Sequence, residues 1–202
     1  MKLYFFPGAS SFSPHIALRE AGLAFDLVKV DIKTGKIAAD GGDFSRINPK
    51  GYVPALELDG GGVLTEVQAI VQYIADRKPE SGLAPKDGTL ERYRLQEWLG
   101  FINSEIHKGF VPLFNPATPE DQKAAARRSL SKRLSFVAGH LEGNEFLLGR
   151  RFSVADGYLY TTLSWCPWLQ FDLAPWPSLI AFRDRVEARP SVQAARAAEA
   201  AA

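Results

Sequence analysis

The sequence has little of what several large classes of protein require. Cys166 is the only cysteine among 202 residues, which excludes an internal disulfide and a cysteine-based metal site. No apolar run reaches the roughly 18 residues of a membrane span, and the segment after Met1 is too short for a signal-peptide core. Charges nearly cancel, with 24 basic and 23 acidic residues, so no general attraction to nucleic acid or membranes is expected. These absences predict a cytoplasmic protein that binds neither nucleic acid nor a membrane.

Histidine is scarce as well. His15, His107 and His140 lie far apart in the chain and show no metal-ligand spacing, so no metal site is predicted. Cys166 lies between Trp165 and Trp168, which indicates a buried and unreactive thiol.

The first part of the chain alternates strand and helix patterns. An apolar run over 3–6 is followed by a loop and a helix that stops at Gly22, and 25–32 alternates apolar and polar residues like a second strand. Strand, helix, strand predicts a parallel pair with a right-handed crossover. Residues 59–62 mark a hairpin turn between two short strands, and a helix is expected over 66–78.

Prolines and glycines break up residues 80–88, which is the best candidate for a linker. Beyond them only helical patterns are found, over 89–110, 119–141, 153–166, 177–189 and from 192 to the end of the chain. The sequence therefore predicts an α/β domain over 1–79 and an all-helical domain over 89–202.

The start of the helix at 66–78 combines features that suit a charged ligand. Thr65 is a good N-cap, and Gln68 follows it at the spacing of a capping box. The first N–H groups of a helix can hold an anion, and Glu66 adds a carboxylate beside them. Amide donors next to a carboxylate fit a free amino acid, which carries both charges. The interpretation is a zwitterion site.

Two serines occupy the loop between the first strand and the first helix. Ser10 and Ser11 are expected at the carboxyl end of a strand, where α/β sheets bind ligands. A hydroxyl there can donate to an anion, and the helix N-terminus adds positive potential. The alternative is that both serines only satisfy backbone groups at a turn. The helix itself has two possible starts, with Ser13 as N-cap before Pro14 or with Ser11 one turn earlier.

A polar stripe marks the first long helix of the second part. Gln96, Gly100, Asn103 and His107 are spaced by 4, 3 and 4 positions and therefore share one face. Gly100 costs about 1 kcal/mol relative to alanine inside a helix. Either close helix packing or room for a ligand offsets this cost, and the sequence alone favours packing.

Six segments together resemble a bacterial glutathione S-transferase, most closely the beta class. They occur in the order found in that family and extend over nearly the whole chain: 2–9, 13–20, 48–56, 64–70, 105–110 and 152–156. The resemblance implies a thioredoxin-like first domain, an all-helical second domain, a homodimer and a cis bond between Val53 and Pro54. It also implies a detoxification enzyme that conjugates its co-substrate glutathione to hydrophobic electrophiles bound between the domains, with no metal.

The resemblance also implies roles for particular residues. Glu66 and the amide of Val67 hold the γ-glutamyl end of glutathione, the backbone of Val53, before Pro54, pairs with its cysteinyl part, and Lys36 approaches its glycine carboxylate. Ser104 and His107 line the other wall of the site. Ser10 or Ser11 would stabilise the glutathione thiolate, and His107 could donate to the same sulfur or to a leaving group.

This chain departs from the family pattern at three positions. Serine stands at position 10, where the beta class usually has cysteine, Val67 replaces a glycine or serine, and Gly100 replaces a polar residue. A thiol–disulfide oxidoreductase is disfavoured because it needs a protein thiolate in the first loop. A non-catalytic binding protein of the same fold remains the alternative, supported by the serine at position 10 and by Val67.

Overall fold

The sheet of the first unit is arranged around its first strand. The computed structural model describes residues 1–202, and its five strands have the order β3-β2-β1-β4-β5. Their bounds are β1 (Lys2–Phe5), β2 (Asp26–Asp31), β3 (Lys36–Ile37), β4 (Ala55–Glu57) and β5 (Val63–Thr65). β1 pairs with β2 in parallel and with β4 antiparallel, and β4 pairs antiparallel with β5. The predicted parallel pair and hairpin are confirmed.

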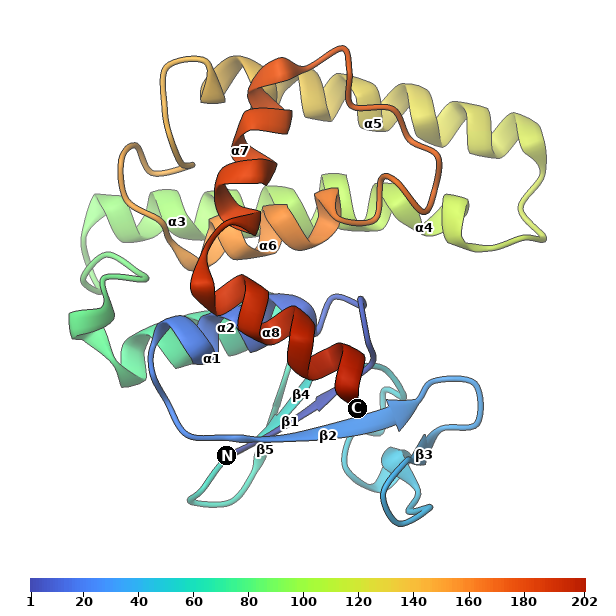
Figure 1. Ribbon diagram of the computed structural model, residues 1–202, viewed down its shortest axis with the longest axis vertical. Helices are drawn as coiled ribbons and strands as arrows, with labels where there is room; N and C mark the ends of the chain where they lie inside the picture. The colour runs from blue at the N-terminus through green and yellow to red at the C-terminus, as the bar shows by residue number, and fades with distance from the viewer. The chain divides into compact units, whose positions relative to one another are not determined.

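Side chains of β1 are buried on both faces of the sheet. Helices α1 (Phe12–Glu20) and α2 (Val67–Arg77) pack in the same unit (Figure 1), and the Phe5 ring faces His15 of α1 at 6.5 Å between ring centroids. Tyr4 points the other way, into a cluster with Val30, Phe44, Val53 and Ala55. Because successive residues of a strand face opposite sides, three consecutive apolar residues can serve two cores.

The last helix belongs to the first unit. Residues 1–84 and 188–202 form one unit and residues 85–187 the other. Helix α8 (Pro190–Ala201) therefore belongs to the unit of the sheet, where it packs against α1, although it follows the helical segment in sequence. Figure 1 shows α8 in red beside α1. Arg189, just before α8, binds both carboxylate oxygens of Glu20 at 2.6 and 2.8 Å. A helical pattern does not reveal which unit a helix joins, and this explains the difference from the expected range 89–202.

The second unit contains only helices. They are α3 (Leu90–Phe101), a π-helical segment η3 (Ile102–His107), α4 (Lys108–Phe114), α5 (Glu120–Leu141), α6 (Val154–Leu163) and α7 (Pro177–Glu187). Short 3-10 helices η1 (Phe44–Arg46) and η2 (Pro79–Ser81) lie in the first unit. The long helix expected to end at Phe110 continues to Phe114, because Pro112 lies within α4 and does not break it.

The start of α6 is the capping box that the sequence predicted. Asp156 accepts hydrogen bonds from the Ser153 amide at 2.8 Å, the Ser153 hydroxyl at 2.7 Å and the Leu147 amide at 2.8 Å. The Asp156 side chain is fully buried, and this burial raises its pKa to about 6 in spite of the three donors. The box therefore fixes the helix start at the cost of burying a carboxylate.

Two glycines of the long helix differ in their surroundings. A Cβ added to Gly109 would lie 2.8 Å from Cδ2 of Leu130, whereas one added to Gly100 would meet nothing within 4 Å. Close helix packing therefore explains Gly109 and not Gly100.

Two expectations about absent features concern the whole chain. No helix combines the length and the apolar character needed to cross a bilayer. No cluster of three or more histidine, cysteine, aspartate or glutamate side chains could hold a metal ion. Cys166 is buried as expected, and burial raises the pKa of its thiol to about 12.

Candidate functional site

Three segments meet at one edge of the sheet. Tyr4 lies opposite Ala55 in the β1–β4 pair, and Ala55 lies opposite Thr65 in the β4–β5 pair. The loop after β1, the turn before β4 and the start of α2 therefore leave the sheet at the same edge. This topology brings together the predicted residues of the first unit other than Lys36, which lies exposed on β3 opposite Asp31.

The two serines of the loop after β1 behave differently. The Ser11 hydroxyl is completely buried, donates to the Phe6 carbonyl and accepts from the Phe6 amide, both at 3.2 Å. The turn-satisfying alternative therefore holds for Ser11. The Ser10 side chain makes no hydrogen bond within the chain, and its hydroxyl oxygen is not completely buried. The Ser10 hydroxyl is therefore available to a partner outside the chain.

The backbone of the same loop presents two further donors. The Ala9 amide bonds to the Phe6 carbonyl, and the Ser13 amide bonds to the Ser10 carbonyl. The amides of Ser10 and Ser11 bond to no acceptor in the chain. Helix α1 begins at Phe12 with Ser11 as N-cap, so the earlier of the two expected starts is confirmed and Ser13 is not the cap. One hydroxyl and two amides at a helix start suit an anion.

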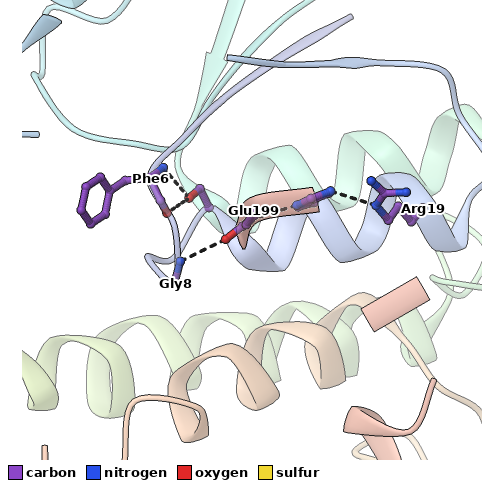
Figure 2. A network of polar contacts seen from close by, with 6 residues as sticks. Phe6, Gly8, Arg19 and Glu199 are labelled. Carbon is purple, nitrogen blue, oxygen red and sulfur yellow. Dashed lines mark hydrogen bonds and ion pairs between the residues drawn. The ribbon is translucent and has the colours of Figure 1, made fainter. Parts of the chain in front are cut away.

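The middle of the loop is anchored from α8. The Gly8 amide donates to Oε2 of Glu199 at 3.0 Å, and His15 of α1 contacts Oε1 of Glu199 at 3.0 Å. Arg19 donates its Nε–H to Nε2 of His15 at 2.9 Å. Figure 2 shows this network, with Glu199 reaching from α8 toward the loop between Phe6 and Gly8. No feature of the sequence predicted a link between positions that are 191 residues apart.

The start of α2 differs from the capping box expected at Thr65. Thr65 belongs to β5, and the N-cap is Glu66, whose side chain makes no capping bond. Because the Thr65 backbone takes part in the sheet ladder with Ala55, it cannot also serve as the cap. Glu66 has a φ of 68°, a conformation that costs a non-glycine residue about 1–3 kcal/mol and that clusters at functional sites.

Backbone donors lie beside a carboxylate at the start of α2, where the zwitterion site was predicted. Ala69 is the first residue of α2 whose amide bonds to Glu66 O, so the amides of Val67 and Gln68 have no acceptor within the helix. The Val67 side chain is buried, so its amide is the group that this residue offers to a ligand.

Two residues that sequence reasoning missed hold the Glu66 carboxylate. Oε1 of Glu66 accepts from Nζ of Lys50 at 2.6 Å and from the Tyr52 hydroxyl at 2.7 Å. The bond to Glu66 raises the pKa of both Lys50 and Tyr52. Their proximity to the Asn48–Pro54 turn was the only available signal.

The turn before β4 has the geometry that the resemblance implied. The bond between Val53 and Pro54 is cis, as predicted. Val53 is buried in the Tyr4 cluster, and Asn48 holds the turn by donating from its side chain to the Tyr52 carbonyl.

The predicted residues of the second unit lie on the π-helical segment η3. Ser104 is exposed, and Nδ1 of His107 lies 2.7 Å from the Tyr158 hydroxyl, which donates to Oδ1 of Asn103 at 3.1 Å. Because the Tyr158 hydroxyl donates its proton to Asn103, its oxygen accepts a hydrogen bond from Nδ1–H of His107. In the neutral imidazole the lone pair is then on Nε2. π-Helical turns occur frequently at functional sites. The Asn103–His107 half of the predicted polar stripe is therefore joined through Tyr158.

Comparisons with known proteins agree with the geometry. Residues 1–76 match the family model for the glutathione S-transferase N-terminal domain, and residues 101–190 match that for the C-terminal domain. The chain is 44% identical over 199 residues to glutathione S-transferase GstA of Escherichia coli O157:H7, covering 98% of each chain.

Solved structures give the same result. The ternary complex of BphK, a bacterial glutathione S-transferase, superposes with a TM-score of 0.97 at 56% identity, covering 99% of this chain and 100% of that one. A sphingomonad glutathione S-transferase complexed with glutathione has a TM-score of 0.96 at 50% identity and covers 100% of both chains. The beta-class enzyme of Sphingomonas chungbukensis has a TM-score of 0.95 at 51% identity, with 98% of each chain covered.

Proposed function

The chain belongs to the glutathione S-transferase family, and from that premise we propose that it joins the sulfur of glutathione to the electrophilic carbon of a hydrophobic substrate. Glutathione is the co-substrate, and no metal takes part. The nucleophile is the thiolate. A free cysteine thiol has a pKa of about 8.5 and is only a few per cent ionised at neutral pH. The protein must therefore stabilise the sulfur anion.

The observation that carries this proposal is the set of three unused donors in the loop after β1. The Ser10 hydroxyl and the amides of Ser10 and Ser11 have no acceptor within the chain, and α1 starts directly behind them. Donors of this kind, fixed by the fold before the substrate arrives, stabilise a developing anion without reorganisation. We assign thiolate stabilisation to Ser10 and a loop-closing role to Ser11.

Recognition of glutathione is assigned to the same sheet edge and to Lys36. Glu66 receives the α-ammonium of the γ-glutamyl group, and the amide of Val67 receives its carboxylate. The backbone of Val53, fixed before Pro54, pairs with the cysteinyl part, and Lys36 approaches the glycine carboxylate.

Of the residues of the second unit, Ser104 is assigned to binding glutathione and His107 to the reaction. His107 is assigned to donating to the sulfur of glutathione or to a leaving group, and its Nδ1 lies 2.7 Å from the Tyr158 hydroxyl. Donation from Nε2 to a leaving group requires the doubly protonated ring.

Three single substitutions test the assignment of Ser10. Ser10→Ala removes one hydrogen bond to a charged group, worth about 1.5–3 kcal/mol, and should raise the pKa of bound glutathione by about 1–2 units. The thiolate absorbance of bound glutathione across a pH series measures this pKa. Ser11→Ala should lower stability by orphaning the Phe6 backbone groups, with a smaller change in the thiol pKa.

Ser13→Ala is the matched control, because the Ser13 hydroxyl is buried and has no partner. This variant should keep the thiol pKa of the unmodified protein and should not lower its stability, because no hydrogen bond is lost and an unsatisfied buried hydroxyl is removed. An unchanged thiol pKa in Ser10→Ala, or a shift of equal size in Ser13→Ala, would remove Ser10 from the mechanism.

A non-catalytic glutathione- or ligand-binding protein of the same fold is the second candidate. Two departures support it: serine stands at position 10, where the beta class usually has cysteine, and the buried Val67 side chain offers no hydroxyl to the γ-glutamyl carboxylate. Retention on immobilised glutathione, followed by turnover assays with a panel that includes an activated aryl halide, separates the two functions. Conjugation of any member of the panel supports the transferase, whereas retention without turnover across the panel supports the binding protein.

We also propose that the protein acts as a homodimer in the cytoplasm and removes toxic electrophiles, as the family resemblance implies. Light scattering after size exclusion tests the dimer, since a monomer would elute with the 22.2 kDa mass of one chain. Fractionation of the native host tests the location. Deletion of the gene should increase sensitivity to the electrophiles that the enzyme conjugates.

A further inference from the structure

Glu199 is a buried carboxylate to which no role in the reaction has been assigned. It lies on α8 with 5% of its surface exposed. Each of its oxygens accepts from a different element, Oε2 from the Gly8 amide in the loop and Oε1 from His15 on α1. A buried charge needs such donors, and losing one leaves its partner unsatisfied. Glu199 is therefore the point at which helix, loop and α8 are joined.

The direction of the hydrogen bonds in this network follows from Arg19. An arginine Nε–H can only donate, so Nε2 of His15 accepts from it at 2.9 Å. The proton of the neutral ring then lies on Nδ1 and is donated to Glu199. The network runs from Arg19 through His15 to Glu199, and Glu199 accepts the Gly8 amide as well (Figure 2).

The loop between β1 and α1 is held at two places. Ser11 ties the loop back to Phe6, which closes its base. Gly8 lies between these two residues with a φ of 72°, and its amide is held by Glu199. Ser10, with its unused hydroxyl, is only two positions beyond Gly8. The Ser11 bonds fix where the loop starts and ends, and the Glu199 bond fixes the position of its middle.

We propose that Glu199 is a positioning residue, which holds the loop so that the Ser10 hydroxyl and the Ser10 and Ser11 amides converge on the sulfur of glutathione. This inference rests on the proposed transferase function. It places the last helix of the chain in the control of sulfur activation.

The chain provides a matched control at the start of α8, the end opposite to Glu199. Glu20 of α1 is bound by Arg189 through two hydrogen bonds and by the Ser191 hydroxyl. Glu20→Ala therefore loosens α8 at its start and leaves every bond to the loop in place. Glu199→Ala loosens the same helix and also releases Gly8. An effect found in Glu199→Ala alone belongs to the loss of the Gly8 and His15 bonds, and exchange of the Gly8 amide reports the change in the loop.

The experiment compares the unmodified protein with Glu199→Ala, Glu199→Gln and Glu20→Ala. Hydrogen exchange of the Gly8 amide reports the bond itself, and the pKa of bound glutathione reports its consequence. In Glu199→Ala, Gly8 exchange should become at least about tenfold faster, as expected for loss of a bond to a charged acceptor. The bound thiol pKa should rise by about one unit, and kcat should fall by about tenfold with KM for glutathione nearly unchanged.

Glu199→Gln keeps one carbonyl oxygen for the Gly8 amide and should restore most of the exchange protection and part of kcat. It also tests the proposal if Glu199→Ala does not fold. Glu20→Ala should lose stability but keep the Gly8 exchange rate, the thiol pKa and kcat of the unmodified protein.

Two results would overturn the positioning role while the transferase function stands. One is equal shifts of the thiol pKa in Glu20→Ala and Glu199→Ala. The other is unchanged Gly8 exchange in both Glu199 variants. A different failure would show in the unmodified protein, where a bound thiol with the pKa of free glutathione would contradict the proposed function itself.

Discussion

Asp156→Asn provides a test of how the second unit is stabilised. The Asp156 carboxylate is fully buried and accepts three hydrogen bonds, yet burial raises its pKa from 3.8 to about 6. Desolvation therefore outweighs the amide of Leu147 and the amide and hydroxyl of Ser153. The native state holds a proton at this carboxyl more tightly than the unfolded chain does.

The size of the contribution of Asp156 to stability follows from the shift of its pKa. A rise of about 2 units corresponds to about 3 kcal/mol. Because the folded pKa is the higher one, the stabilisation from this group is fully present below pH 3.8 and is lost as the pH rises through about 6. About half of the change falls between pH 5 and 8.

Asparagine removes the titration and one acceptor. Its single carbonyl oxygen can serve the Leu147 amide, but its NH₂ group faces the Ser153 amide, at a cost of about 1–3 kcal/mol at every pH. The variant should therefore be less stable than the unmodified protein at pH 5. The difference in free energy of unfolding between the two proteins should narrow by about 1–2 kcal/mol by pH 8, where the unmodified protein has lost the contribution of Asp156.

Urea unfolding at fixed protein concentration from pH 5 to 8 measures the gap. Asp87→Asn, at an exposed position of residues 80–88, is the control for the exchange of aspartate for asparagine itself. A gap for Asp156→Asn that widens as the pH rises would refute the reasoning, because it would mean that the hydrogen bonds favour the charged carboxylate more than burial opposes it.

Two further predictions use matched pairs. Gly100→Ala should stabilise the protein by up to about 1 kcal/mol through helix propensity, whereas Gly109→Ala should destabilise it by about 1–3 kcal/mol, because the new Cβ meets Leu130 at 2.8 Å; urea unfolding of both variants measures the difference, and two effects of the same sign would contradict it. Glu66→Ala and Glu66→Gly should both weaken glutathione binding at least about tenfold, as expected for loss of a charged partner. Only glycine adopts the φ of 68° without strain, so the free energy of unfolding of Glu66→Gly should be about 1 kcal/mol higher than that of Glu66→Ala. Calorimetric titration with glutathione and urea unfolding check the second pair, and equal stability of the two variants would show that the backbone of Glu66 is not strained.

Much of the fold was predictable because its signals are local. Alternation over 25–32 marked β2, Asp59 with the glycines at 60–62 marked the β4–β5 hairpin, and Ser153 with Asp156 marked the start of α6. The cap of α2 was wrong, because Thr65 has the right side chain but its backbone already belongs to the sheet. A side-chain pattern gives no information about a backbone that is fixed by tertiary pairing.

The candidate site was predictable in its location and less so in its chemistry. Order along the chain indicated that the loop after the first strand and the start of α2 would be important. It could not separate Ser10 from Ser11, because the two side chains are identical and only the bonds of Ser11 to Phe6 distinguish them. Lys50 and Tyr52 were missed, since their partner Glu66 is reached by tertiary folding and not by helical or strand spacing.

The departures at Ser10 and Val67 acquire a common explanation from the backbone. The loop offers two amides beside the Ser10 hydroxyl, and α2 offers the amides of Val67 and Gln68 beside Glu66. At both places the anionic group of glutathione in the proposed function would meet N–H groups, which any residue except proline supplies. A change of side chain at these positions therefore removes one donor from a set and does not abolish it. The residues that matter more are those that hold the backbone in place, and Glu199 reaches the loop from outside it.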